Sequence, residues 1–219
     1  MIYSLIVYTL AIYFSFIVLN MKIPLFIFLL IFTANQTFAQ LLDSIALSKE
    51  IEYKSLEEAL KNPDKVYKLN LKKKKYTTIP KEVFTFKNLQ ILILSKNKLT
   101  EVPKELGNLK NLEKLDLSNN KLFALPIEIG ELRNLKDLII NRNIIETLPK
   151  EIGNLTKLRF IDMWSNELYE FPDEISLLKD NLKLLDLRVI RMSFRAQDRI
   201  YEQLPNTVIL FSKGCNCDD

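Results

Sequence analysis

A pattern of apolar residues returns every 23 residues from Val66 onward, and it restricts the possible folds more than any other feature of the chain. Its clearest copy spans residues 112–134, where L-x-x-L-x-L is followed by Asn120 and then by Leu-Pro-x-Glu-Ile-Gly. Further copies begin at Leu89, Leu135 and Leu158, and the last begins one residue late, at Leu182. Units with a period of about 20–29 residues bury their apolar faces only by stacking on one another. The pattern therefore predicts a solenoid of stacked repeats.

The two halves of each repeat predict different structures. The opening L-x-x-L-x-L predicts a short strand, and successive copies predict a parallel sheet of about six strands on the concave side of a curved, horseshoe-like α/β solenoid. The Leu-Pro-x-Glu-Ile-Gly half predicts a short helical turn on the convex side, begun by proline and ended by a glycine at positive φ. Phe84 and Ser176 stand at the glycine position of the first and fifth copies, so those turns are expected to differ.

An asparagine follows the strand in most copies of the repeat. Because the chain turns there inside a stack, a buried amide can satisfy backbone groups of its own turn and of the adjacent one. We therefore interpret this asparagine column as structural, and it comprises Asn97, Asn120, Asn143 and Asn166. Lys74 and Ile190 take its place in the first and last copies, which marks the ends of the stack.

The repeats, residues 66–188, are expected to lie between two caps, because terminal repeats must cover an apolar face. Residues 40–65 predict an N-terminal cap helix with Ser55 as its N-cap, Glu58 as the partner of that cap and Pro63 as its stop. Residues 189–219 predict a C-terminal cap and tail, with an amphipathic helix over 195–204 and a closing strand over 207–211.

Residues 1–39 form a hydrophobic segment in which Lys22 is the one charged residue. Read from Met21, Lys22 is a short basic region, residues 23–32 an apolar core, and residues 37–39 a small-x-small cleavage site before Gln40. The preferred interpretation is a signal peptide that starts at Met21 and is cleaved. In the alternative, residues 1–33 associate with a membrane and anchor the chain. Both interpretations place the repeats outside the cytoplasm, either secreted or on the cell surface.

Composition excludes several kinds of chemistry. The chain has no histidine, which excludes serine–histidine and cysteine–histidine dyads and histidine-bound metals. Three of its four glycines belong to the repeats, which leaves no glycine-rich phosphate loop. The net charge of +4 is dispersed, which argues against a nucleic-acid partner. We therefore predict no catalytic residue, no metal and no cofactor. Cys215 and Cys217 leave a strained disulfide, a bond to another chain and a soft-metal site all open.

Residues 55–211 resemble leucine-rich-repeat proteins, and the copies are closest to the 23-residue Leu-Pro-x-Glu-Ile-Gly class, of the bacterial secreted type. The resemblance implies non-catalytic recognition of a protein partner through the concave face of a chain expected to be monomeric. It carries over no catalytic residue. The function expected is therefore that of a secreted or surface-exposed protein-binding module. The alternative is a membrane-tethered structural or envelope protein.

The exposed strand positions supply the candidate binding residues. Several are apolar where exposure to solvent is expected, and the single tryptophan of the chain, Trp164, lies among them. Tryptophan and arginine are enriched in the residues that dominate interface energies, whereas scattered apolar surface residues are ordinary. We expect the site to centre on Trp164, with aromatic area and a cation converging there. The candidates are Ile91, Ile93, Ile139, Arg142, Phe160, Asp162, Trp164, Leu184 and Arg188.

Two charged features have competing interpretations. Asp116, Asp162 and Asp186 share one column, where they could bind a cation or transfer protons, but solvated surface carboxylates are preferred. Residues 72–75 are four consecutive lysines, which could attract an anionic lipid or polymer. The preferred interpretation is that they prevent pairing at an open sheet edge.

Overall fold

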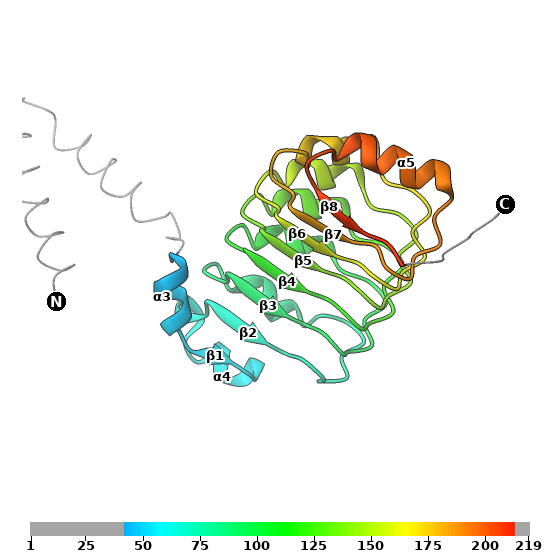
Figure 1. Ribbon diagram of the computed structural model, residues 1–219. Helices are drawn as coiled ribbons and strands as arrows, with labels where there is room; N and C mark the ends of the chain where they lie inside the picture. The colour runs from blue at the N-terminus through cyan, green and yellow to red at the C-terminus, as the bar shows by residue number, and fades with distance from the viewer. Residues whose placement is uncertain (1–41, 213–219) are drawn as a thin grey trace, which may run out of the picture. The chain divides into compact units, whose positions relative to one another are not determined.

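The computed structural model describes residues 42–212. In this part of the chain, eight short parallel strands lie side by side in chain order (Figure 1). They are β1 Glu52–Tyr53, β2 Lys68–Asn70, β3 Ile91–Ile93, β4 Lys114–Asp116, β5 Asp137–Ile139, β6 Phe160–Asp162, β7 Leu184–Asp186 and β8 Val208–Leu210. The predicted solenoid with a parallel sheet is confirmed. The sheet exceeds the expected six strands because β1 and β8, from the two ends of the described region, add to the sheet of repeats.

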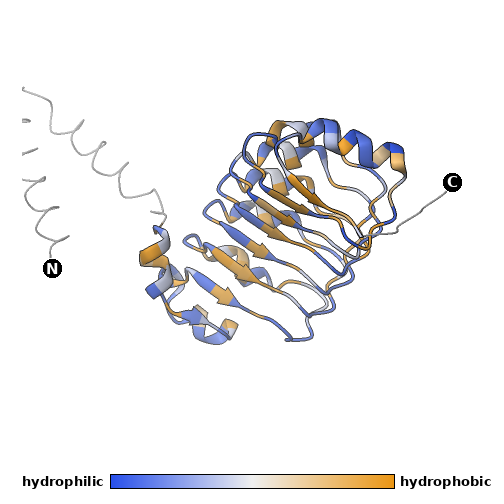
Figure 2. Cartoon of the chain, viewed as in Figure 1, coloured by the Kyte–Doolittle hydropathy of each residue, from blue (hydrophilic) through white to orange (hydrophobic). Residues whose placement is uncertain are grey.

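The core lies between the sheet and the convex turns. The central residue of each repeat strand faces inward, and Leu69, Leu92, Leu115, Leu138 and Ile161 have no exposed surface. In β2 to β6 the residues on either side of the central residue are half-buried, as the two-residue alternation of a strand requires, whereas in β7 Asp186 is buried as well. Figure 2 shows apolar residues at the same place in successive strands. Apolar burial is the dominant favourable contribution to folding, so the 23-residue period is also the period of the core.

The convex turns are 3₁₀ helices, and a proline precedes each of them. The i to i+3 spacing of their apolar residues suits a helix with three residues per turn. Four of them have five residues, but the turn that contains Ser176 has six. They are η2 Lys81–Thr85, η3 Lys104–Asn108, η4 Ile127–Glu131, η5 Lys150–Asn154 and η6 Asp173–Leu178.

The expectation that glycine ends each turn at positive φ is wrong, because Gly107, Gly130 and Gly153 all lack that conformation. They are needed because neighbouring turns approach closely. A Cβ atom on Gly153 would lie 2.5 Å from the carbonyl oxygen of Glu174 in the next turn. The corresponding distance from Gly130 to the Glu151 oxygen is 2.7 Å. Glycine therefore permits contact between successive turns here.

The rim turns follow the strands, and a non-glycine residue takes a positive φ in each of them. These residues include Lys73, Lys96, Asn119, Arg142, Ser165 and Val189. The asparagine column comes directly after them. The Oδ1 atom of Asn143 accepts the N–H of Leu122 at 3.0 Å, and its Nδ2 donates to the carbonyls of Leu117 at 3.1 Å and Ile140 at 2.9 Å. Asn97, Asn120 and Asn166 make equivalent bonds to their own and the preceding repeat.

A second row of asparagines lies before the strands. The side chains of Asn88, Asn111 and Asn134 each donate to a backbone carbonyl of the preceding repeat, at 2.8 to 2.9 Å. These residues were not predicted from the sequence as structural. Their own spacing of 23 residues was the signal that could have identified them.

The N-terminal cap contains α3 Ser44–Lys49, β1, α4 Leu56–Leu60 and η1 Pro63–Lys65. The predicted N-cap is confirmed, because Ser55 Oγ accepts the N–H of Glu58 at 3.2 Å. Neither α3 nor β1 was predicted. The buried side chain of Gln90 holds the start of this cap, since it accepts the N–H of Leu42 at 2.9 Å and donates to its carbonyl at 3.0 Å.

Strand β1 covers part of the sheet edge beside the lysines at 72–75. It pairs with Lys68 and Leu69 of β2, on the side that faces away from β3. The four lysines follow β2 in a rim turn, beyond the residues that β1 pairs, so their protection of an open edge stays a prediction.

The C-terminal cap consists of α5 Phe194–Gln203 and β8, which lie at the same end of the stack (Figure 1). Ile200 of α5 and Leu204, the residue at its C-terminal cap, are buried as expected. The predictions for residues 1–39 and for Cys215 and Cys217 lie outside the described residues. Within residues 42–212, every helix is too short or too polar to cross a membrane.

Candidate functional site: the concave face

Two rows of side chains cross the outer surface of the sheet, because alternate residues of each strand point away from the core. The register places Lys68, Ile91, Lys114, Asp137, Phe160, Leu184 and Val208 in the first row. The second row holds Asn70, Ile93, Asp116, Ile139, Asp162, Asp186 and Leu210.

Four of the apolar candidates fall into two groups on this surface, whereas Ile139 lies in the second row between Asp116 and Asp162. Phe160 and Leu184 are neighbours in the first row and continue into Val208, which forms one apolar stripe across β6, β7 and β8. Val208 is 59% exposed. Val208 was not among the residues predicted from the sequence, because the closing strand was not counted among the binding strands. Ile91 and Ile93 lie apart on β3, between residues of β2 and β4 that are polar or charged.

Trp164 lies four residues after Phe160, past Asp162 and toward the rim. The guanidinium carbon of Arg142 lies 4.5 Å from the centroid of the Trp164 ring, which is a cation–π contact. Trp164 is half-buried, and Arg142 is exposed and takes a positive φ of 53°. The contact with Arg142 holds the Trp164 ring in place, and part of the ring stays exposed to solvent.

Arg188, the other cation that we expected near Trp164, is engaged elsewhere. Its Nη2 atom lies 2.6 Å from Asp186 Oδ2 and its Nε atom 2.9 Å from Asp186 Oδ1. This bidentate hydrogen bonding to Asp186 raises the pKa of Arg188. The cation stacked on the aromatic ring is therefore Arg142.

The three aspartates of the second row each have a local partner. Asp116 Oδ1 accepts the hydroxyl of Ser118 at 2.6 Å, and Asp162 Oδ2 accepts the amide of Asn141 at 2.6 Å. Asp186 is 5% exposed, so its interpretation as a solvated carboxylate is wrong. Burial raises the pKa of Asp162, and the neighbouring Asp186 carboxylate adds to that shift. Residues 42–212 contain no cluster of three or more metal-ligating side chains.

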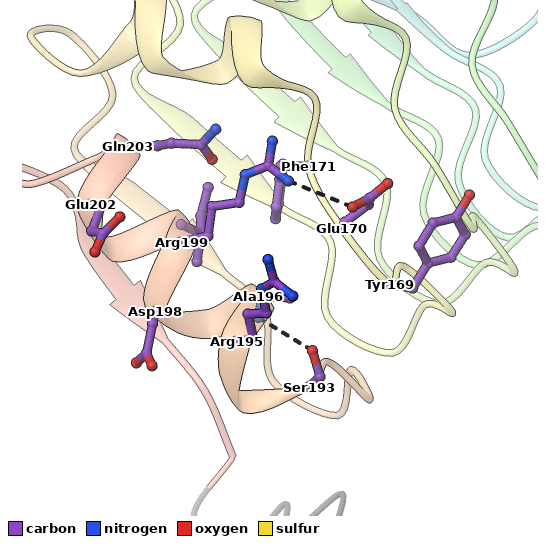
Figure 3. Close-up of a pocket in the computed structure, with 11 residues that line it drawn as sticks. Tyr169, Glu170, Phe171, Ser193, Arg195, Ala196, Asp198, Arg199, Glu202 and Gln203 are labelled. Atoms are coloured by element: carbon purple, nitrogen blue, oxygen red, sulfur yellow. Dashed lines mark hydrogen bonds and ion pairs between the residues drawn. The ribbon is translucent and has the colours of Figure 1, made fainter. Parts of the chain in front are cut away.

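A cleft of about 930 Å³ lies away from the sheet, between α5 and residues 169–171 (Figure 3). Arg199 reaches across it to Glu170 at 3.7 Å and binds Asp173 at 2.5 Å. These ion pairs tie α5 to the last convex turn. We therefore assign the charged residues at this cleft to the attachment of the cap.

The family of the chain follows from its repeats. Residues 64–210 match the family model described as "Leucine-rich repeat region". The chain therefore belongs to the leucine-rich-repeat family. Regions of this kind are typically binding scaffolds whose stacked units present an extended concave surface, commonly to protein partners.

Solved structures show the same fold. A leucine-rich-repeat protein of Leptospira interrogans is 34% identical with a TM-score of 0.62, over 74% of this chain and 48% of that one. This chain thus spans about half the length of the Leptospira protein. Internalin C2 of Listeria monocytogenes is 22% identical with a TM-score of 0.60, over 75% of this chain and 69% of that one, and it supports the fold alone.

A chain of the PEPR1–AtPEP1 crystal structure is 33% identical with a TM-score of 0.51, over 61% of this chain and 19% of that one. No curated protein matches the chain.

Proposed function

We propose that this chain is a non-catalytic protein-binding module whose partner contacts the concave face around Trp164. The observation that carries the proposal is the Trp164 ring, held by Arg142 on the same face as the apolar stripe of Phe160 and Leu184, with Asp162 between Phe160 and Trp164 along the chain. An aromatic ring that is already held in place loses little conformational freedom on binding and offers a large contact area. Tryptophan and arginine are also the side chains that dominate interface energies.

The size of the sheet restricts how the partner binds. Eight strands at a spacing of ~4.8 Å, with a length of ~10 Å for three residues, give a flat area on the order of 350 Å². A standard interface buries about 800 Å² on each partner. We infer that a tightly bound partner also contacts the rim turns that border the sheet.

The test compares two double variants of the full chain as baits for one binding protein. Phe160→Ala with Trp164→Ala removes the aromatic surface of the concave face, whereas Phe123→Ala with Tyr169→Ala removes two aromatics that are 59% and 53% exposed away from the strands. A protein captured by the parent is expected to lose at least about 2 kcal/mol of binding free energy with the first variant.

Binding of that protein to the control variant is expected to stay close to that of the parent. Urea unfolding of each variant separates a loss of binding from a loss of stability. Equal affinity of the parent and the concave variant would move the site to the convex or cap surfaces.

We further propose that the chain acts outside the cytoplasm. This rests on Lys22, on the apolar residues 23–32 and on the small-x-small sequence at 37–39. N-terminal sequencing of the native protein is expected to begin at Gln40. An intact Met1 in a membrane fraction would instead support the membrane-tethered alternative.

A further inference from the structure

The rim turns after β2, β3 and β4 carry a dense positive charge. Residues 72–75, 95–98 and 118–121 consist only of lysine, serine and asparagine, and seven of these twelve residues are lysines. All seven are exposed, and within residues 42–212 none of them forms an ion pair. We name this set the lysine rim: Lys72, Lys73, Lys74, Lys75, Lys96, Lys98 and Lys121.

The lysines lie on adjacent turns. The N–H of Lys73 donates to the carbonyl of Ser95 at 3.1 Å, and the N–H of Lys98 donates to the carbonyl of Tyr76 at 2.8 Å. Successive turns therefore follow the strand spacing of ~4.8 Å and bring like charges close together. Such self-repulsion opposes folding. The lysine rim is thus a source of instability in the isolated chain.

Edge protection does not account for the whole lysine rim. β1 pairs with Lys68 and Leu69 of β2, and the turns that carry Lys96, Lys98 and Lys121 follow strands inside the sheet, which have neighbours on both sides. Lys73 and Lys75 also take positive φ values of 60° and 63°, a conformation that asparagine or glycine adopts more easily. The corresponding turns of later repeats carry less unpaired positive charge. Arg142 stacks on Trp164, Arg188 forms an ion pair with Asp186, and Glu167 adds a negative charge.

The lysine rim borders the proposed binding face. A recess of about 280 Å³ is lined by Lys54, Asn70 and residues 72–74. Asn70 belongs to the second row of the concave face, so the recess joins that face to the rim. A partner on the concave face that also contacts the rim turns would meet these lysines over the first three repeats.

We propose that the lysine rim binds an acidic polypeptide segment of the protein partner. This proposal rests on the proposed function and names the partner's chemistry at one end of the site. Residues 72–75, 95–98 and 118–121 include no aromatic side chain on which a nucleic-acid base could stack and no apolar side chain to insert into a bilayer. Tyr76, which follows Lys75, packs against the core, and the exposed Phe123 lies two residues beyond Lys121. Carboxylates satisfy the charge and the ammonium hydrogen bonds without either feature. The partner is thereby oriented with its acidic part over β2 to β4 and its apolar part over β6 to β8.

The probe for this site is fluorescently labelled poly-L-glutamate, whose binding to the full chain is followed by anisotropy. We expect an affinity that falls as salt rises from about 50 to about 300 mM, because the lysines are exposed. Replacing Lys73, Lys75, Lys96 and Lys98 by Gln is expected to weaken binding at least about tenfold at low salt. The control replaces Lys81, Lys87, Lys104 and Lys150 by Gln. These four lysines are exposed and form no ion pair within residues 42–212, so this variant loses the same total charge as the first variant. Because they lie outside the lysine rim, binding of poly-L-glutamate should stay within about twofold of the parent.

Three results would overturn the proposal. These are no binding of poly-L-glutamate by the parent, equal losses in both variants, or rim-dependent binding of phosphatidylglycerol vesicles without binding of poly-L-glutamate. Thermal unfolding of both variants verifies that they fold. Trp164→Ala is expected to leave poly-L-glutamate binding unchanged, so failure of the lysine rim and failure of the concave site give different results.

Discussion

Replacing the repeat glycines by alanine tests why glycine recurs on the convex side. In a helical turn with room for a methyl group, glycine-to-alanine replacement normally stabilises a protein by about 0.4–1 kcal/mol, because it restricts the unfolded chain. Here the added Cβ would meet the next turn at three different distances. Its nearest neighbour is 3.1 Å away at Gly107, 2.7 Å away at Gly130 and 2.5 Å away at Gly153, where ordinary contact begins at 3.4 Å.

The kind of neighbouring atom sets the magnitude. At Gly107 the nearest atom is the Glu128 Cβ, which can shift by a few tenths of an ångström. At Gly153 it is the backbone oxygen of Glu174, so a whole turn must move. Overpacking of this kind costs about 1–3 kcal/mol. We expect Gly107→Ala to be within about 1 kcal/mol of the parent, and Gly153→Ala to lose about 3 kcal/mol or more.

The assay is urea unfolding of the full chain, followed by circular dichroism. Gly153→Ala should lower the midpoint by more than about 1 M with an unchanged slope, and Gly130→Ala should fall between the other two variants. Lys150→Ala, an exposed change in η5, provides the reference and should stay within about 0.5 kcal/mol. Equal midpoints for Gly107→Ala and Gly153→Ala would refute close approach as the reason for glycine.

Two further changes test the interior turns and the concave face. Asn143→Ala leaves the buried N–H of Leu122 without its acceptor, and we expect it to lose roughly 1–3 kcal/mol in the same urea assay. A midpoint equal to that of Lys150→Ala would show that these amide bonds contribute nothing. Burial raises the pKa of Asp162 above its ordinary value of 3.8, so the folded chain binds this proton more tightly and the free energy of unfolding falls as pH rises through the folded pKa. Asp162→Asn is therefore expected to be more stable than the parent at neutral pH and to lose that advantage below about pH 4, whereas an advantage independent of pH would contradict the assigned cause.

The 23-residue period predicts the sheet well, because it specifies which residues face inward. It identifies Leu115 and Leu138 as core and Phe160 as outward, and the local cap of Ser55 follows from a four-residue motif. It does not give the distance between successive turns. The role of Gly153 was therefore misjudged, since that role depends on an atom in the following repeat.

The sequence also does not predict which side chains of the candidate site contact one another. Alternation places Trp164, Asp186 and Arg188 outside the core, but it does not determine which charged groups are already paired. Arg188 turns to Asp186, two residues away in its own chain segment, whereas Arg142 reaches Trp164 from the previous repeat. Strand β1 has only two residues, too few for an alternating pattern, and its pairing with β2 appears only in three dimensions.

The asparagine column gives the stack a direction. Each amide reaches back to the repeat before it: Asn97 accepts from Tyr76, and Asn166 accepts from Ile145. Loss of the first repeat would remove the Tyr76 N–H that Asn97 accepts and the Leu71 carbonyl to which Asn97 donates, and it would leave the N–H groups of Gln90 and Ile91 without the Tyr67 carbonyl. Loss of the fifth repeat would strand the N–H of Ile145, which is fully buried. Each asparagine therefore joins two repeats in one direction, so that removal of a repeat leaves its preceding neighbour with a buried N–H that lacks an acceptor and its following neighbour with an amide that lacks its partners.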